Sequence, residues 1–362
     1  MGRPAASLCL LLIALLAAGP ALSASGAPDA PSVVKRELIR ESARLSDLGQ
    51  AAARDALARA FEVPVTEADV VAALSRAMVE NGSSEYVAGF EAIVASGPAS
   101  AIPHGEPSDD AANLILPGEV VVVDIGARYK GWVSDNTKTY FMGPNPPEEF
   151  VEIYGVVKEA QTLASAAVQS GALARDLDSL ARTFIDSKGY GEFFIHCLGH
   201  GVGLYVHVPP MLCPDSDDVL ITARNDVVAV EPGVYLEGCF GIRIEDDFAV
   251  LRTGAERYTF APSELEEILI APPALWNGSS PSGEFADFSG CAFAVDPVAA
   301  AGGRNPVPAA PPGSQAGLLW AAGVAVAAGA ALAYRFAPVE VKVRLAAAAH
   351  RPAARLAGLR RR

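Results

Sequence analysis

The chain has 362 residues, of which 51% are hydrophobic, and it contains 33 glycines and 27 prolines. A chain of this composition can bury a sizeable core, so it is not expected to be disordered as a whole. Its formal net charge is −14, and the acidic excess lies in the body, because residues 335–362 hold eight Lys or Arg against one acid, Glu340. A body this acidic lacks the basic face that phosphate requires, which argues against nucleic-acid binding.

Both ends of the chain carry apolar segments of the kind that meet membranes. Residues 8–18 (LCLLLIALLAA) follow Arg3 and precede small residues, which predicts a secretory signal peptide over residues 1–27, with a buried N-terminal helix as the alternative. Residues 316–334 hold no charge, and at ~1.5 Å per residue they just cover a ~30 Å hydrocarbon core. They predict a transmembrane helix, with a soluble Ala-rich helix as the alternative. The basic residues 335–362 then predict a cytoplasmic tail, so that the protein would sit in the cell membrane by a single pass with its body extracellular.

The first elements of the body are two helices and a strand. Leu and Ala recur at helical spacing over residues 33–60, which predicts an amphipathic helix. A second helix is expected to begin at Thr66, where TEAD resembles a capping box, and to end at Asn81-Gly82. The run EVVVVDI, residues 119–125, predicts a buried strand that ends near an acid.

The rest of the body mixes helices with paired strands. Two further helices are expected at residues 147–169 and 174–188, and residues 226–251 alternate like strands joined by Gly-rich turns. The order of elements predicts one α+β domain over residues 28–271. Residues 272–315 are rich in Pro, Gly, Ser and Ala without periodicity, which predicts a flexible stalk.

Four cysteines lie outside the predicted signal peptide: Cys197, Cys213, Cys239 and Cys291. None forms a CxxC pair, which disfavours a structural zinc site. One or two disulfides are compatible with an extracellular body, but the sequence leaves their connectivity open.

Three of the five histidines of the chain fall within twelve residues of the segment HCLGHGVGLYVH, namely His196, His200 and His207. The interleaved glycines disfavour a helix, and no HExxH motif is present. Glycine in such a place indicates that the backbone closely approaches a ligand or another strand.

Four acids occupy apolar surroundings where an unpaired charge would be costly. Asp124 ends the apolar strand, and Asp135 follows it after a Gly- and Trp-containing stretch typical of a hairpin, which would fold the second acid beside the first. Glu231 and Glu245 lie in the apolar stretches VVAVEPGVY and GIRIEDDF. The alternative is that each acid has its own partner, but the body holds few bases to serve them.

A pair of divalent cations would remove the repulsion among four converging carboxylates. Oxygen ligands alone suit calcium or magnesium, and an added imidazole favours manganese, iron, cobalt or zinc. Two such ions about 3.5–4 Å apart can hold a bridging hydroxide and polarise a carbonyl.

This ordered set resembles the five-ligand dinuclear site of the pita-bread (creatinase/aminopeptidase) metallopeptidases, which include methionine aminopeptidases, prolidases and aminopeptidase P. The resemblance covers about residues 35–271, through the motifs IPHGEPSD, DIGARYKGWVSDNTKT, HCLGHGVGLYVH, EPGVYLEG and GIRIEDDFAVL. It implies an α+β pita-bread fold and two divalent metal ions per chain, with manganese expected first and cobalt, zinc or iron as alternatives. The metal ligands that it implies are Asp124, Asp135, His200, Glu231 and Glu245.

The resemblance also implies roles for each residue. Asp124 would bind one ion, His200 and Glu231 the other, while Asp135 and Glu245 would bridge both. Three catalytic roles follow: His207 would contact the substrate carbonyl, His104 would lie near the scissile amide, and Glu231 would carry a proton to the leaving amine.

Within the family, His196 and the GxRxED pattern around Arg243 resemble the proline-specific branch, and methionine aminopeptidases lack that arginine. His196, Arg243 and Thr137 are expected to bind substrate or to support the ligands. The chain departs from that branch at Val208, Ala229 and Lys138, where Glu, Thr and Arg are common. Only about thirty residues precede the resemblance, so the N-terminal non-catalytic domain typical of that branch is not expected.

The sequence therefore predicts a membrane-anchored extracellular hydrolase that cleaves Xaa-Pro bonds, as an Xaa-Pro aminopeptidase or a prolidase, through a metal-bridging hydroxide. Its partners would be peptides with proline at the second position and the membrane. One alternative is a methionine-type or broad-specificity aminopeptidase, and one of another class is a peptide-binding pseudoenzyme or surface receptor on the same fold.

Overall fold

The computed structural model describes residues 32–84, 91–110, 113–274 and 276–286, together with Phe288 and Cys291. The predicted signal peptide, transmembrane helix and cytoplasmic tail lie outside these residues. No helix in this described part combines the length and the apolar character that crossing a bilayer requires.

Two long helices form the N-terminal part of the domain, as the sequence predicts. Helix α2 (Ser32–Arg59) buries an apolar stripe that includes Leu45 and Leu57, and helix α3 (Glu67–Glu80) packs against it. Thr66 caps α3: its hydroxyl accepts from the Asp69 backbone N–H at 3.2 Å, and the Asp69 carboxylate accepts from the Thr66 N–H at 3.0 Å. This reciprocal pair satisfies two N–H groups that a helix start leaves without partners, so the predicted capping box is confirmed.

The strands form two main sheets, and both are antiparallel. The first has the order β1-β2-β5, and its central strand is the predicted apolar run. The second has the order β12-β11-β8-β6-β7. The strands of these sheets are β1 (Ile93–Ser96), β2 (Val120–Ile125), β5 (Asn136–Phe141), β6 (Gly199–Gly201), β7 (Val208–Leu212), β8 (Val227–Val230), β11 (Asp246–Val250) and β12 (Ala255–Arg257).

Each sheet has a hairpin inserted between two of its paired strands. One joins β3 (Arg128–Tyr129) to β4 (Trp132–Val133) and returns the chain from β2 to β5, as the spacing of the two aspartates predicts. The other joins β9 (Gly233–Leu236) to β10 (Phe240–Arg243). The strands on either side of this hairpin, β8 and β11, also pair with each other. The region predicted as strands over residues 226–251 therefore consists of an inner pair, β9–β10, and an outer pair, β8–β11.

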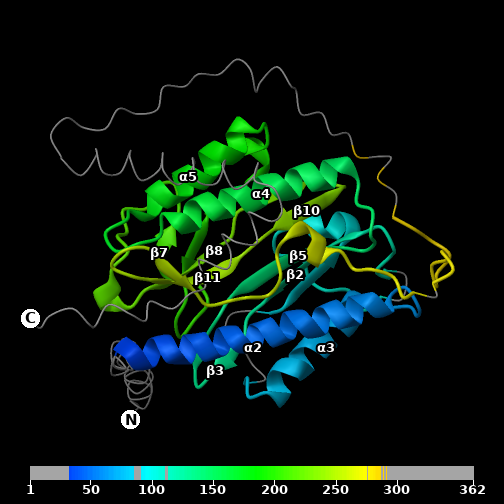
Figure 1. Ribbon diagram of the computed structural model, residues 1–362, viewed down its shortest axis with the longest axis horizontal. Helices are drawn as coiled ribbons and strands as arrows, with labels where there is room; N and C mark the ends of the chain where they lie inside the picture. Colours follow the sequence, from blue (N-terminus) through cyan, green and yellow to red (C-terminus); the bar gives the residue numbers. More distant parts are fainter. Residues whose placement is uncertain are drawn as a thin grey trace, which may run out of the picture. The chain divides into compact units, whose positions relative to one another are not determined.

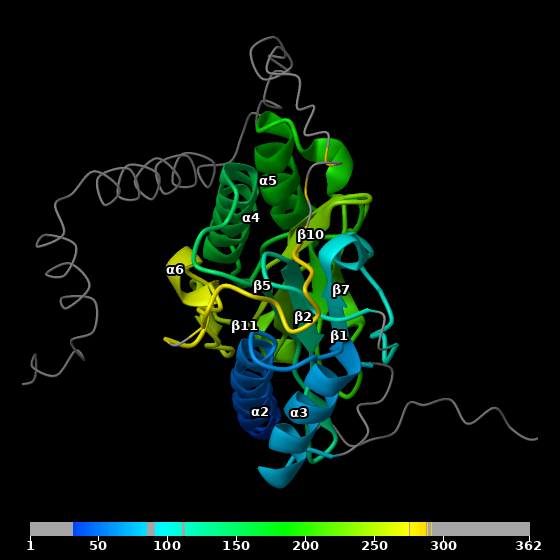
Figure 2. The same cartoon turned by 90° about the vertical axis from the view of Figure 1, so that its right-hand side faces the viewer.

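Helices cover the strands from two sides (Figures 1 and 2). Helices α4 (Glu148–Ala166) and α5 (Ala174–Ser187) lie together on one side, and α2 and α3 lie on the opposite side (Figure 1). A four-residue helix, α6 (Leu265–Ile268), lies beside α4 and β5. The remaining helical turns are η1 (Gly97–Ala101), η2 (Gly191–Phe193) and η3 (Thr222–Arg224).

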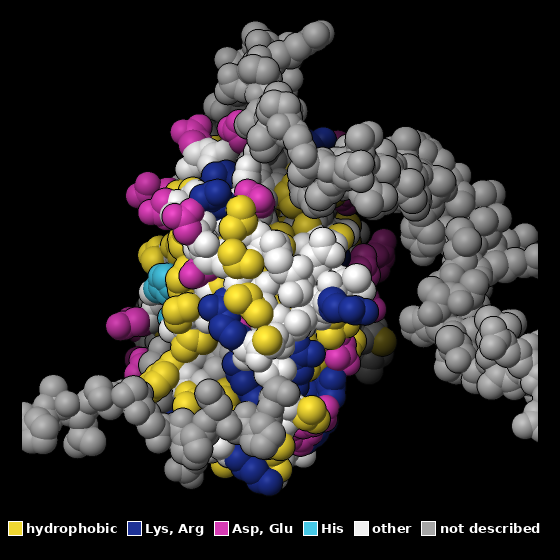
Figure 3. All heavy atoms as spheres, turned by 90° about the vertical axis from the view of Figure 1, so that its left-hand side faces the viewer, with side chains coloured by type: hydrophobic (Ala, Val, Ile, Leu, Met, Phe, Trp, Pro, Cys, Tyr) yellow, Lys and Arg dark blue, Asp and Glu magenta, His cyan; other side chains and the backbone are white. Residues whose placement is uncertain are grey.

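Basic side chains gather on one part of the face that Figure 3 shows. On the face in Figure 3, most of the Lys and Arg side chains lie in the lower half, at the height of α2. Arg36 of α2 donates to the carbonyl oxygen of Val250, and Arg40 pairs with Glu256 at 2.9 Å. These contacts fasten the first turns of α2 to the end of β11 and to β12.

The beginning of the range predicted as a stalk packs against the domain. Trp276 stacks edge-on against Phe61 with ring centroids 5.3 Å apart, and Phe288 packs in the same manner against Phe240 at 5.8 Å. Cys291 is disulfide-bonded to Cys239. The packing therefore continues twenty residues beyond the expected boundary at 271, because scattered aromatic residues and one cysteine supply contacts that a lack of periodicity does not reveal. Residues 292–315 lie outside the described part.

Candidate metal centre and substrate pocket

The five residues predicted as metal ligands lie together between the two sheets. Asp124 lies in β2 and Asp135 immediately before β5, whose register pairs Asp124 with Thr137. The other three come from the second sheet and its connections: His200 in β6, Glu231 directly after β8 and Glu245 directly before β11.

Donor atoms of these side chains approach one another closely. Ligand atoms of Asp135, His200 and Glu245 all lie within 4.8 Å of one another. The Nε2 atom of His200 is 3.3 Å from Glu231 Oε1 and 3.6 Å from Asp135 Oδ2. Arg243 holds Asp124 through a bond of 2.6 Å from Nη2 to Oδ2.

The glycines around His200 are required by the close approach of neighbouring strands. A Cβ atom on Gly199 would lie 2.0 Å from the carbonyl oxygen of Ala229, and one on Gly201 would lie 2.6 Å from that of Val208. Both contacts are with backbone of the strands on either side, so neither can relax without moving the sheet. The pattern Gly-His-Gly therefore lets β6 lie between β7 and β8 with the imidazole inside.

Burial and mutual repulsion govern the protonation of the carboxylates. Burial raises the pKa of Asp135, and the charges of Glu245 and Asp124 raise it further, to well above its ordinary value. The pKa of Glu245 rises well above its ordinary value by burial and by the charges of Glu231 and Asp124. In Glu231, burial is outweighed by the hydrogen bond and charge of His200, which lower its pKa to about 2. Crowded acids of this kind are stabilised as anions by bound cations.

Two buried oxygens show that the cluster fits divalent cations. Asp124 Oδ1 and Glu245 Oε1 are buried and have no hydrogen-bond partner among the described residues, although the other oxygen of each side chain is bonded. Buried polar atoms are nearly always partnered, so an orphaned carboxylate oxygen calls for a further ligand. A donor set of carboxylates plus one imidazole suits a transition-metal ion.

Arg243 connects the candidate ligands to the wall of the pocket. Its side chain is 3% exposed, and each of its three nitrogens donates a hydrogen bond. Nη2 donates to Asp124, Nη1 to the Tyr235 hydroxyl at 2.8 Å, and Nε to the Thr137 hydroxyl at 3.2 Å. Thr137 in turn donates to Glu245 Oε2 at 2.7 Å, so one guanidinium orients two candidate ligands.

The remaining predicted residues line a cavity of about 420 Å³ beside the cluster. His196 Nε2 is 2.8 Å from the Tyr235 hydroxyl. The ring of His207 lies edge-on to that of His200 with centroids 4.4 Å apart. His104, on the exposed segment that follows η1, lies on the same cavity wall. The structure thus places the predicted site residues around one cavity except Thr137 and Glu245, which are hydrogen-bonded to each other and are not part of its lining.

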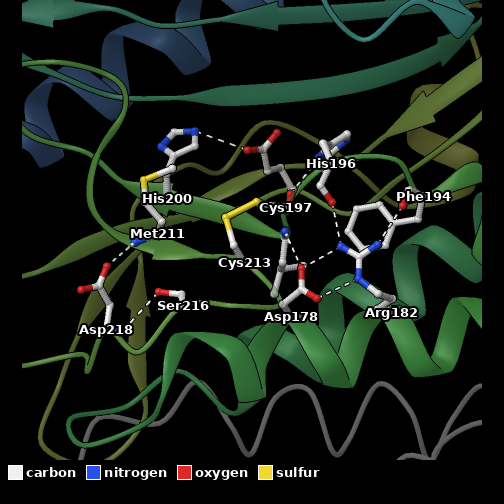
Figure 4. The surroundings of a disulfide bond; sticks show 12 residues. Asp178, Arg182, Phe194, His196, Cys197, His200, Met211, Cys213, Ser216 and Asp218 are labelled. Atoms are coloured by element: carbon white, nitrogen blue, oxygen red, sulfur yellow. Dashed lines mark hydrogen bonds and ion pairs between the residues drawn. A yellow bond between two sulfur atoms is a disulfide. The ribbon is translucent and has the colours of Figure 1, made fainter.

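A disulfide and an ion pair hold the histidine segment in place (Figure 4). Cys197 and Cys213 are bonded across the base of the β6–β7 hairpin, with a Cα–Cα distance of 4.5 Å. On α5, Asp178 accepts from the Leu198 N–H at 3.0 Å and pairs with Arg182. Arg182 donates to the carbonyl oxygens of residues 194 and 196, at 2.8 and 2.7 Å. Backbone on both sides of Cys197 is therefore fixed.

Several residues of the site were not predicted from the sequence. Tyr235 bridges His196 and Arg243, and its only signal was its place in the motif EPGVYLEG. Asp247 accepts from the Asp135 N–H at 2.9 Å, and the sequence marked it only as the third acid of IEDD. Lys138 is fully buried, where it donates to the Glu245 carbonyl oxygen at 2.6 Å and pairs with Asp246 at 3.1 Å.

Buried carboxylates around an imidazole beside a peptide-sized cavity define a metal-dependent hydrolase class, and comparison with known proteins agrees with that class. The pattern of metallopeptidase family M24 matches residues 37–252. The chain belongs to this family, and the predicted pita-bread fold is confirmed.

Individual relatives are similar over the same part of the chain. An uncharacterized peptidase of Bacillus subtilis is 40% identical over 243 residues, which are 66% of this chain and 67% of the relative. The Xaa-Pro dipeptidase of Pyrococcus furiosus is 38% identical over 63% of this chain and 62% of its own length.

Solved structures give the same result. The prolidase from Pyrococcus furiosus superposes with a TM-score of 0.58 at 38% identity, over 63% of this chain and 64% of that one. The X-Pro aminopeptidase from Thermotoga maritima superposes with a TM-score of 0.58 at 38% identity, over 65% and 64%. The chain spans less than two thirds of the length of most of these relatives.

Proposed function

We propose that the protein is a metal-dependent hydrolase that cleaves the peptide bond between an N-terminal residue and proline. The observation that carries this proposal is the buried ligand cluster, with its two orphaned carboxylate oxygens, open to a cavity large enough for a short peptide. The names of the relatives, which include Xaa-Pro dipeptidase and X-Pro aminopeptidase, support the substrate class.

Two divalent ions would be held by Asp124, Asp135, His200, Glu231 and Glu245. We propose manganese first, with cobalt, zinc or iron as alternatives, because an imidazole among carboxylates favours these metals over calcium. Bound there, the ions would polarise the scissile carbonyl and lower the pKa of a water molecule.

Residues of the chain itself would bind the peptide and move the proton. The side chain of Glu231 is 18% exposed, more than the 4% of either His200 or Asp135, and faces the cavity, so it can pass a proton to the leaving proline nitrogen. His207 and His104 line the same cavity and can donate hydrogen bonds to the substrate carbonyl and the scissile amide. His196 and Arg243, joined through Tyr235, form a rigid wall on which the substrate is oriented.

We also propose that the domain works outside the cell, anchored in the membrane by residues 316–334. The apolar segments at the two ends and the basic residues after the second one support this arrangement. The two disulfides give independent support, because such bonds persist mainly in oxidising compartments. Protease added to intact cells should release an active soluble fragment, whereas recovery of the whole chain in the cytosolic fraction would overturn the location.

One assay tests the catalytic proposal. The metal-free protein is loaded in turn with manganese, cobalt or zinc and offered Xaa-Pro dipeptides, longer Xaa-Pro peptides and Met-Ala peptides. We expect hydrolysis only of the proline series, lost with chelator and restored by metal. Preferred cleavage of Met-Ala would indicate a methionine-type aminopeptidase. Tight peptide binding without turnover in any metal would indicate a peptide-binding pseudoenzyme.

A further inference from the structure

The cavity beside the candidate ligands carries further acidic groups apart from those ligands. Two further carboxylates, those of Glu91 and Glu106, line it and are solvent-exposed, so they lie at its rim. Among the described residues that line the cavity, Arg243 is the single Lys or Arg. Residues 85–90, which precede Glu91 in the sequence, contain no Lys or Arg either.

Arg243 is not available to a substrate anion. Its guanidinium is buried, its charge is paired with Asp124 at 2.6 Å, and its other two nitrogens donate to Tyr235 and Thr137. Drawing it toward a substrate carboxylate would break all three of these hydrogen bonds, which is costly for a buried side chain.

Loading the site with metal does not reverse the charge of the cavity. Two divalent ions would carry four positive charges, which the four candidate carboxylate ligands balance. The single positive charge of Arg243 is then outnumbered by the two negative charges of Glu91 and Glu106, so the Arg and Glu side chains that remain sum to a negative charge.

A free dipeptide would place its own carboxylate in these surroundings. With the scissile carbonyl at the ligand cluster, the C-terminal carboxylate of an Xaa-Pro dipeptide lies at most two residue lengths away, about 7 Å. An anion in the cavity meets no Lys or Arg other than Arg243 among the described lining residues, and the charges of Glu91 and Glu106 repel it. A longer peptide has a neutral amide at the same point and carries its carboxylate further from the ligand cluster, by roughly 3.5 Å for each added residue.

We propose that this site discriminates against free Xaa-Pro dipeptides and acts on longer peptides with proline in the second position, with Glu91 and Glu106 as specificity determinants. This inference rests on the proposed function and narrows it to release of the N-terminal residue.

Substrates that differ only at the C-terminus test the effect of the C-terminal carboxylate charge. The same Xaa-Pro sequence is supplied as the free acid, as the C-terminal amide and extended by one alanine, and kcat/KM is measured for each with the metal-loaded full chain. We expect the amide and the tripeptide to exceed the acid by at least ~10-fold, because an unpaired carboxylate meets like charges. Raising the salt concentration should narrow the gap by screening the rim.

Variants then locate the effect. Glu91→Gln with Glu106→Gln should reduce the amide-to-acid ratio by roughly 3-fold or more, and Glu106→Lys should reduce it further. Glu80→Gln, at the exposed end of α3 and outside the cavity lining, is the matched control and should leave the ratio unchanged. Equal kcat/KM for acid and amide, or a ratio that does not respond to Glu106→Lys, would overturn the inference.

A binding measurement separates this inference from the proposed function. Calorimetry with the manganese-loaded protein should show tighter binding of the Xaa-Pro amide than of the acid, whether or not either is cleaved. Failure to cleave any peptide, together with that order of affinities, would refute the peptidase proposal and uphold the charge selectivity. Cleavage of the acid and the amide with equal efficiency and equal affinity would uphold the peptidase proposal and refute the charge selectivity.

Discussion

We expect one of the two disulfides to contribute more to the free energy of unfolding and the other to contribute more to catalytic activity. In the loop-entropy description, the stabilisation by a disulfide grows with the length of chain that it closes. Cys197–Cys213 closes 16 residues and should contribute about 3 kcal/mol to the free energy of unfolding, and Cys239–Cys291 closes 52 residues and should contribute about 4 kcal/mol.

Their places in the structure reverse this order for catalysis. Cys197 lines the substrate cavity and, through Cys213, closes the hairpin that carries His200 and His207. Cys239 lies in the β9–β10 turn and is not part of the cavity lining. A displacement of ~1 Å among catalytic groups can cost ~10²-fold in rate, so the first disulfide is the one on which turnover depends.

The test compares two double variants, Cys197→Ala/Cys213→Ala and Cys239→Ala/Cys291→Ala. Urea unfolding of the metal-free proteins gives the loss of stability without the contribution of metal binding. Turnover is then measured on the metal-loaded proteins at a temperature where both variants are folded.

We expect the first variant to lose about 3 kcal/mol and at least ~10-fold in kcat, and the second to lose about 4 kcal/mol with kcat within ~2-fold of the parent. If both variants lose activity in proportion to stability, the disulfide beside the histidines has no positioning role. If the first variant keeps full activity, the reasoning from the hairpin is refuted.

Three further changes probe the ligands, the oxyanion donor and one remote, partly buried acid. Asp135→Asn or Glu245→Gln should abolish turnover and at least halve the metal bound per chain, as measured by elemental analysis, because each side chain is expected to contact both ions. Two metals per chain with normal turnover would exclude the dinuclear assignment. His207→Ala should lower kcat by ~10²-fold while leaving metal content intact, and a parallel loss of metal would make His207 a ligand instead. Burial raises the pKa of Glu119 from 4.5 to about 7, against the opposing hydrogen bond from the Leu116 N–H. The native state therefore binds more protons than the unfolded chain between these values, and the free energy of unfolding should fall as pH rises from about 4.5 to 7. Glu119→Gln should flatten that slope and stabilise the protein above pH 7 by on the order of 2 kcal/mol; urea unfolding at several pH values measures it, and an unchanged slope would contradict the assigned cause.

Local pattern was sufficient for the elements whose stability is local. The 3.6-residue periodicity and the capping box located α2 and α3 to within a residue or two, and the run of valines located β2. The five candidate ligands were also found from sequence, because acids in apolar strands and glycines around a histidine are conspicuous against their neighbours. The order of these residues resembles that of the ligands in a known family, and this resemblance predicted the fold that brings them together.

Contacts between distant residues were decided only by the tertiary structure. Arg243 and Asp124 are 119 positions apart, and the sequence suggested that the acids lacked basic partners, whereas the strand register places this one guanidinium against Asp124. The pairing of the four cysteines and the bridge that Tyr235 makes between His196 and Arg243 are of the same kind. Periodicity shows which face of a helix or strand is buried. It carries no information about which other helix or strand packs against that face. That choice depends on sheet register and on packing across the whole domain, so the charge of the cavity, and with it the expected selectivity, became visible only in the folded protein.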